Sequence, residues 1–72
     1  MDTLSDRIII LINENDLSHR EFSKRAGISK GSIINALDGG SMLNGRTLVK
    51  ITQAFDISVD WLLGLSDRRT RL

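Results

Sequence analysis

Ser18, His19 and Glu21 have the side chains of a hydrolytic catalytic triad and stand within four positions of the chain. Their spacing fits a structural role better. A serine followed three positions later by a glutamate forms a capping box, in which the two residues satisfy each other's backbone N–H groups at a helix start. Three residues of one helix start do not converge on a substrate as a triad does. We therefore predict that the protein is not an enzyme.

Metal and cofactor chemistry has little support in the composition. The 72 residues include one histidine and no cysteine, so we expect no metal site, no disulfide and no cofactor. The longest aliphatic run, residues 8–12, is far shorter than the ~20 residues of a membrane span, and no signal-peptide pattern precedes it. We expect a cytoplasmic protein with no membrane partner and no small-molecule ligand.

The apolar residues are spaced as in helices along the whole chain. This spacing predicts five helices, over residues 3–14, 19–26, 30–38, 46–55 and 58–63. Hydroxyl residues stand where N-caps are needed and glycines where helices end, among them Gly39–Gly40 after the third helix. We expect an all-α fold, with one compact domain over residues 1–65 and a flexible basic tail or linker over residues 66–72.

The connection between the second and third expected helices is only three residues long, Gly27, Ile28 and Ser29. A turn this short makes the two helices cross steeply, as in a helix-turn-helix. The crossing needs a small residue where the backbones approach, and Ser23 meets that need. Gly27 suits the left-handed turn, Ile28 can plug the corner, and Ile33 can point inward from the third helix. These residues predict a helix-turn-helix.

Two segments together resemble a known family. The first, LSHREFSKRAGISKGSI (residues 17–33), resembles the helix-turn-helix of the Cro and lambda-repressor type of bacterial and phage regulators. The second, TLVKITQAFDISVDWLLGLSD (residues 47–67), resembles the fourth and fifth helices of the same family. The resemblance implies a compact five-helix, lambda-repressor-like domain that binds double-stranded DNA in the bacterial cytoplasm or nucleoid.

The resemblance also implies that the third helix, called the recognition helix below, enters the major groove of DNA. Its expected base contacts are Lys30, Gly31, Ser32, Ile34 and Asn35. Asparagine can bind adenine bidentately, lysine can donate to guanine, an aliphatic side chain can pack on a thymine methyl group, and glycine permits close approach. The expected phosphate contacts are His19, Arg20, Asn44 and Arg46. Each of these residues is also compatible with an ordinary solvated position on a helix.

The positive charge is concentrated, although the net charge is only +1. Arg20, Lys24, Arg25 and Lys30 stand close together in the chain, and further arginines follow in residues 68–72. The first three are equally well explained as an ordinary polar face. So little net positive charge predicts weak non-specific DNA binding with a modest salt dependence. We therefore expect a dimer, which would bind an inverted repeat with two recognition helices.

The first helix departs from the family pattern, which usually has charged residues where this chain has Ile9, Ile10 and Ile12. Part of this aliphatic surface should be exposed, and exposed apolar surface often marks an interface. We expect these residues, with Trp61, to contact a second copy, an antirepressor or a second domain. The alternative is that the fifth helix and the tail cover them.

Two functions are compatible with these patterns. The first is transcriptional regulation, most specifically by a repressor of phage or mobile-element type that binds an inverted-repeat operator as a dimer. The second is a protein-interaction module, an adaptor or antitoxin-like partner, that works through the aliphatic face of the first helix. The basic residues beside a polar recognition helix favour the first function, and the isoleucines keep the second open.

Overall fold

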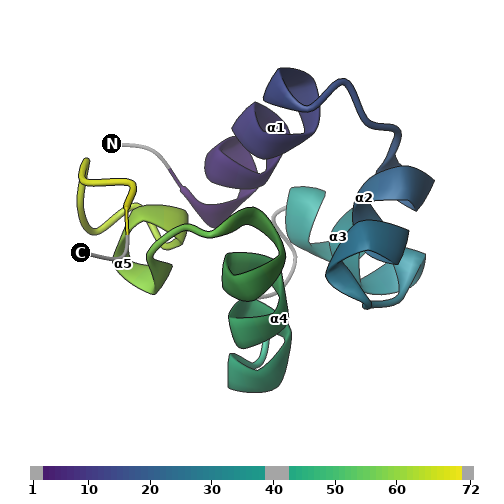
Figure 1. The fold of residues 1–72 in the computed structure, drawn as a ribbon. Coiled ribbons are helices and arrows are strands. Elements are labelled where there is room, and N and C mark those ends of the chain that lie inside the picture. The colour runs from purple at the N-terminus through teal and green to yellow at the C-terminus, as the bar shows by residue number, and fades with distance from the viewer. Residues whose placement is uncertain (1–2, 39–42, 71–72) are drawn as a thin grey trace.

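The computed structural model describes residues 3–38 and 43–70 and shows a compact all-α domain (Figure 1). Its five helices are α1 (Leu4–Glu14), α2 (His19–Ala26), α3 (Lys30–Leu37), α4 (Gly45–Phe55) and α5 (Val59–Leu62). Within the described ranges there is no strand. The number and order of the helices confirm the prediction, and their bounds differ from it by one residue or so at each end. The expected helix stop at Gly39–Gly40 lies outside the described residues.

Every helix begins at a side chain that caps it. The capping residues are Thr3, Ser18, Ser29, Asn44 and Ser58, each of which accepts a hydrogen bond from the backbone N–H three residues later. At α2 the capping box is complete, because Glu21 N–H donates to Ser18 Oγ over 3.1 Å and Ser18 N–H donates to Glu21 Oε1 over 2.9 Å. Ser18 and Glu21 are therefore structural residues of a helix start, where such caps contribute ~1 kcal/mol each.

The corner between α2 and α3 has the geometry that its residues predict. Gly27 takes the left-handed conformation, with φ +75°, and its N–H and that of Ile28 both bind the carbonyl of Ser23, over 2.9 and 3.0 Å. Ser23 is buried and its hydroxyl donates to the carbonyl of His19 over 2.8 Å. Ile28 packs partly buried against the core. The N–H groups of Gly27 and Ile28 thus find an acceptor within the turn, so the chain changes direction here while these hydrogen bonds are kept.

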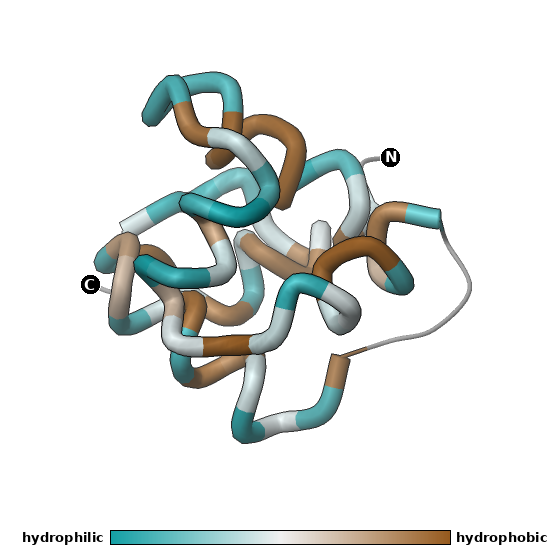
Figure 2. Tube along the Cα trace, turned by 90° about the vertical axis from the view of Figure 1, so that its right-hand side faces the viewer, coloured by the Kyte–Doolittle hydropathy of each residue, from teal (hydrophilic) through white to brown (hydrophobic). Residues whose placement is uncertain are grey.

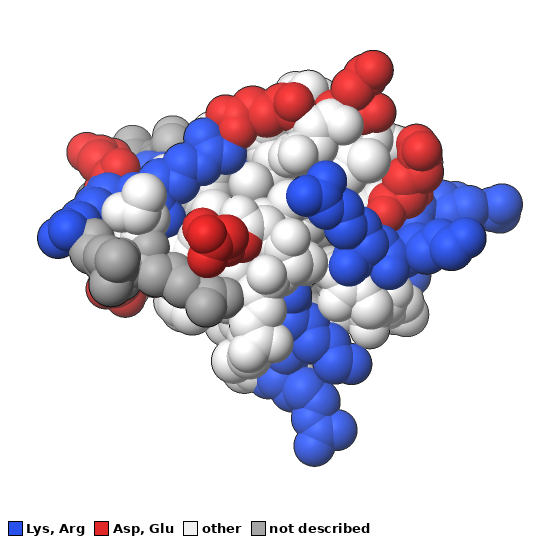
Figure 3. Space-filling view, viewed as in Figure 1, with Lys and Arg blue, Asp and Glu red and all other residues white. Residues whose placement is uncertain are grey.

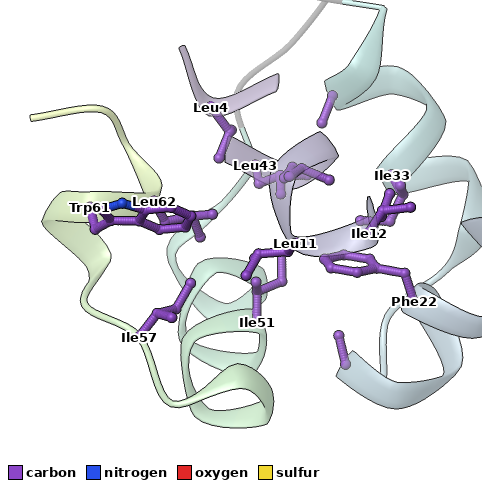
Figure 4. Close-up of a cluster of buried hydrophobic side chains, with 13 residues drawn as sticks. Leu4, Leu11, Ile12, Phe22, Ile33, Leu43, Ile51, Ile57, Trp61 and Leu62 are labelled. Atoms are coloured by element: carbon purple, nitrogen blue, oxygen red, sulfur yellow. The ribbon is translucent and has the colours of Figure 1, made fainter. Parts of the chain in front are cut away.

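The core is built around α1, which packs against α3 and α5. Figure 4 shows Phe22 and Ile33 pointing into the cluster from α2 and α3, while Trp61 approaches it from α5. Hydrophobic and hydrophilic stretches alternate along the trace in Figure 2, as amphipathic helices require. Leu43, just before α4, is only 8% exposed and joins this core. The sequence predicted nothing more than a loop at that position.

Two of the four residues expected at a protein interface, Ile12 of α1 and Trp61 of α5, are buried inside the domain. Ile12 is 7% exposed and Trp61 is 5% exposed, so both belong to the core. Ile10 is half-buried against the same core, and only Ile9, 43% exposed, presents a largely free aliphatic side chain. The physical reason is that α1 has neighbours on more than one side, so a wide arc of its surface is covered.

Residues 66–70, called the C-terminal clasp below, account for part of that cover. The backbone N–H of Ser58 donates to the carbonyl of Arg69 over 2.9 Å, and the Ser58 hydroxyl donates to the carbonyl of Arg68 over 3.1 Å. The guanidinium of Arg69 pairs with the carboxylate of Glu14 at the end of α1. The sequence predicted a flexible basic tail or linker over residues 66–72; in the structure these bonds connect Arg68 and Arg69 to α1 and to the start of α5.

Candidate nucleic-acid interface

The helix α3 buries one stripe of side chains and exposes the opposite one. Ile33 and Ala36 are buried in the core. Of the expected base-contacting residues, Lys30, Gly31 and Asn35 are exposed, and the aliphatic side chain of Ile34 is 39% exposed. The structure therefore brings these four residues together on the outer face of α3.

Ser32, the fifth expected base contact, lies differently. It is half-buried, and its hydroxyl lies 2.8 Å from the hydroxyl of Ser29, which also accepts the Ser32 N–H over 3.2 Å. The two serines thus form a small hydroxyl pair at the first turn of α3. One hydroxyl can donate onward from this pair while the pair keeps its own hydrogen bond.

Gly31 has no close neighbour inside the domain. A Cβ atom built on it would meet nothing within 4 Å, and its φ is not in the left-handed region. The fold therefore does not require a glycine here. A glycine in a helix interior costs about 1 kcal/mol relative to alanine. The missing side chain leaves the backbone of α3 open to close approach from outside.

The expected phosphate contacts lie at the starts of two other helices. His19 and Arg20 are exposed in the first turn of α2, and Arg46 is exposed in the first turn of α4. Asn44 caps α4, because its Oδ1 accepts the backbone N–H of Thr47 over 2.8 Å. The amide NH2 group is consequently the part of Asn44 that can donate to a phosphate.

Not all of the basic residues beside α3 have the same surroundings. Arg25 lies with its guanidinium carbon 4.6 Å from the ring centroid of Phe55, and it donates to Asn15 Oδ1 over 3.4 Å. Both contacts lie within the domain, which is compatible with the interpretation of Arg25 as part of an ordinary polar face. Lys50 of α4, which the sequence did not single out, donates from Nζ to the carbonyl of Gly27 over 3.3 Å.

The charges are unevenly distributed over the surface. Figure 3 shows Lys and Arg side chains gathered along the right and lower edges of the molecule, where Figure 1 places α2 and α4. Most of the acidic side chains in this view lie above and to the left of them. A further basic group lies at the left, toward α5. The edge that carries α2 and α4 is the side best suited to a polyanion.

The carboxylates with shifted pKa values all have structural partners. Hydrogen bonds from the backbone and hydroxyl of Ser18 lower the pKa of Glu21, and those from Thr3 lower the pKa of Asp6 in the same way. The hydrogen bond from Arg69 lowers the pKa of Glu14. These shifts belong to helix caps and to the C-terminal clasp, so they give no support to acid–base catalysis.

The described residues contain neither a membrane-spanning helix nor a metal-binding cluster. No helix among them is both long enough and apolar enough to cross a membrane. Nor do residues 3–38 and 43–70 contain a cluster of three or more side chains able to hold a metal ion.

A steep helix pair with an exposed polar second helix defines the class of helix-turn-helix DNA-binding domains. A family model described as helix-turn-helix matches residues 8–62. The chain belongs to this helix-turn-helix family, of Cro/C1 type. Searches of the curated proteins and of the solved structures gave no match. Membership of this non-enzymatic family makes the protein a sequence-specific DNA-binding protein of a class that regulates transcription.

Proposed function

We propose that the protein is a transcriptional repressor of phage or mobile-element type, which binds an inverted-repeat operator as a dimer and excludes polymerase from it. The observation that carries the proposal is the outer face of α3, where Lys30, Ile34 and Asn35 are exposed together beside Gly31. This combination offers hydrogen bonds and an apolar contact to base edges, which is what distinguishes one DNA sequence from another.

Each residue of that face has a distinct role in the proposal. Asn35 binds an adenine edge, Lys30 donates to a guanine, and Ile34 packs on a thymine methyl group. Gly31 allows the backbone of α3 to lie close to the base pairs. Ser32 donates to a base or to a phosphate from its hydroxyl pair with the N-cap serine.

The starts of α2 and α4 hold the DNA backbone in the proposed complex. His19 and Arg20 from α2, with Asn44 and Arg46 from α4, contact phosphates on either side of the groove that α3 enters. Helix starts favour anions because their N–H groups and dipoles point outward. These contacts set the register of the protein on DNA without reading its sequence.

Dimeric binding follows from the small size of one such surface. A net charge of +1 allows little phosphate neutralisation, so one domain would bind DNA weakly. Two copies related by a twofold axis double the contacts and place the recognition helices about 34 Å apart, one turn of DNA. An inverted repeat is the operator that such a dimer selects.

Selection from a random pool of duplex DNA at near-physiological salt tests the proposal. We expect enrichment of an inverted repeat whose half-sites are centred about 10 base pairs apart. Asn35→Ala should relax the selected sequence at one position of each half-site. Asn13→Ala, which removes an exposed amide from α1, is the matched control and should leave the selection unchanged. Failure of the unaltered protein to enrich any sequence would contradict the proposed function.

A protein-interaction module is the second candidate, and the observation in its favour is the exposed side chain of Ile9. The burial of Ile12 and Trp61 leaves this surface much smaller than the sequence suggested. Under this alternative the protein is itself an adaptor or antitoxin-like partner, and an antirepressor or a second copy binds at Ile9 and Ile10. Ile9→Glu would then change the assembly state or abolish partner binding, while DNA selection would be weak in the unaltered protein.

A further inference from the structure

Two side chains from outside the helix-turn-helix bind backbone carbonyls of α3 and of the turn that precedes it. At the C-terminal end, the hydroxyl of Ser5 in α1 donates to the carbonyl of Leu37 over 3.2 Å. Ahead of the N-terminal end, Nζ of Lys50 in α4 donates to the carbonyl of Gly27 over 3.3 Å. The two donors come from two different helices: Ser5 binds the last residue of α3, whereas Lys50 binds the C-cap residue of α2, in the turn before α3 begins.

Both acceptors are backbone carbonyl groups: one belongs to α3 itself, and the other belongs to the turn that leads into it. The carbonyl of Leu37 is among the last four of the helix, which have no partner within it. Ser5 supplies a donor for it in a part-buried position. The carbonyl of Gly27 belongs to the turn that leads into α3, and the ammonium group of Lys50 binds it in an exposed position.

Core packing holds α3 along its inner stripe. Ile33 and Ala36 anchor this stripe and set how deeply the helix sits. An eight-residue helix is about 12 Å long, so rocking about such an anchor would displace its ends more than its centre. Hydrogen bonds at the C-terminal end of α3 and in the turn before it oppose this rocking most effectively, because these positions are farthest from the anchor.

We propose that Ser5 and Lys50 are positioning residues for DNA reading: together they hold the tilt at which both ends of α3 meet the base pairs. The inference rests on the proposed base contacts of Lys30 and Asn35. These two residues lie more than one helical turn apart, so a change of tilt brings one closer to the DNA and withdraws the other. Bidentate contacts tolerate little displacement, so lost tilt control lowers discrimination between sequences more than it lowers binding in general.

Affinity for the selected operator and for random DNA, measured on the intact chain, tests this role. Ser5→Ala and Lys50→Met should each lower the ratio of operator affinity to random-DNA affinity by roughly three- to tenfold, as expected for loss of one hydrogen bond. The conservative variants Ser5→Thr and Lys50→Arg keep a donor and should recover most of the ratio. Circular dichroism should show the same helix content in all of them.

Lys24→Met is the matched control for charge, because Lys24 is likewise exposed and lies on α2. It should leave the affinity ratio unchanged. If Lys50 instead bound a phosphate, Lys50→Met would weaken binding to both DNAs equally and reduce the salt slope by about 0.9. That result, or an unchanged ratio in the double variant, would overturn the inference.

A measurement without DNA separates this inference from the proposed function. Residual dipolar couplings of backbone N–H groups report the orientation of α3 relative to α1 and α2 in the free protein. The Ser5→Ala, Lys50→Met double variant should show changed couplings in α3 and unchanged ones in α1. If the unaltered protein selects no operator, the proposed function fails. The couplings still test whether Ser5 and Lys50 hold the orientation of α3. Unchanged couplings in α3 would refute it.

Discussion

The guanidinium group of Arg69 lies over the indole ring of Trp61, with its central carbon 4.7 Å from the ring centroid. The same guanidinium pairs with Glu14, the last residue of α1. Arg7 of α1 lies over this ring as well, also at 4.7 Å, and pairs with Asp67 over 3.3 Å. Charged residues thus link both ends of the domain's chain around one buried aromatic ring.

Replacement of Arg69 should destabilise the domain. Arg69→Met removes the cation–π contact and the ion pair with Glu14, and we expect the free energy of unfolding to fall by about 1 kcal/mol. Arg68→Met is the control, because the Arg68 side chain is exposed and its clasp contacts are made by backbone atoms. Urea unfolding followed by circular dichroism measures both. Equal stability of the Arg69 variant and the unaltered protein would show that the Arg69 side chain contributes nothing to the stability of the fold.

The lowered carboxylate pKa values predict loss of stability in acid. Glu14, Glu21 and Asp6 have folded-state pKa values below their usual range, because hydrogen bonds favour the ionised form. Their contribution is therefore complete above the unfolded-state pKa, about 4.3 for glutamate, and is lost as the pH falls through the folded-state values. The melting temperature should be nearly constant from pH 7 to about pH 5 and fall below about pH 4.

Glu14→Gln and Glu21→Gln divide that acid response between the clasp and the α2 cap. Each variant should melt lower than the unaltered protein near pH 7 and show a shallower decline on acidification, since one lowered pKa has been removed. Thermal melts at a series of pH values provide the measurement. A decline with unaltered steepness in both variants would assign the acid response to other groups.

Two glycines should respond in opposite directions to alanine. Gly31→Ala meets no clash and improves helix propensity, so the free energy of unfolding should rise by about 0.5–1 kcal/mol. Gly27→Ala places a Cβ atom on a residue with φ +75°, and should lower it by about 1–2 kcal/mol. Urea unfolding of each variant and of the unaltered protein measures both changes in the free energy of unfolding. A destabilised Gly31 variant would mean that the domain itself requires this glycine.

The same Gly31 variant should bind its operator less tightly despite its greater stability. In the proposed complex the backbone of α3 lies close to the base pairs, and an added methyl group prevents that approach. We expect at least a tenfold loss, or about 1.4 kcal/mol of binding free energy. Fluorescence anisotropy with labelled operator measures it. Unchanged affinity would remove Gly31 from the proposed interface.

The stacked rings of Phe22 and Phe55 join α2 to α4, with centroids 4.9 Å apart and planes inclined by 15°. Phe22 is fully buried, whereas Phe55 is partly buried. Phe22→Ala should therefore cost about 3–5 kcal/mol, enough to unfold much of so small a domain, and Phe55→Ala should cost less. Far-ultraviolet circular dichroism measures the helix content of the two variants, and near-ultraviolet circular dichroism measures their tertiary packing. A milder effect at Phe22 than at Phe55 would contradict this account of the core.

Local chemistry was sufficient to predict the helix starts and the corner of the helix-turn-helix. A cap such as Ser18 binds an N–H only three residues away, and Gly27 takes its left-handed conformation at the end of the same helix. Such bonds depend on neighbours in the chain, so residue type and spacing indicate them. The buried stripe of α3 follows from helical periodicity in the same way.

The helical spacing of the sequence also indicated that Ile12 is buried, although the departure from the family pattern at this position suggested an interface residue. Ile12 stands four residues after the buried Ile8, so helical spacing places both on one stripe of α1. Leu43 had no such signal, because it precedes α4 and follows no helical repeat. Its burial depends on where the chain re-enters the core between α3 and α4.

By itself, the sequence determined the five helices, their order, the corner at Gly27 and the family to which the chain belongs. Only the tertiary structure decided the pairing of the clasp residue Arg69 with Glu14, and the bonds from Ser5 to the end of α3 and from Lys50 to the turn before it. Each of these contacts joins residues far apart in the chain. Their existence depends on the angles at which whole helices pack, and no local spacing specifies those angles.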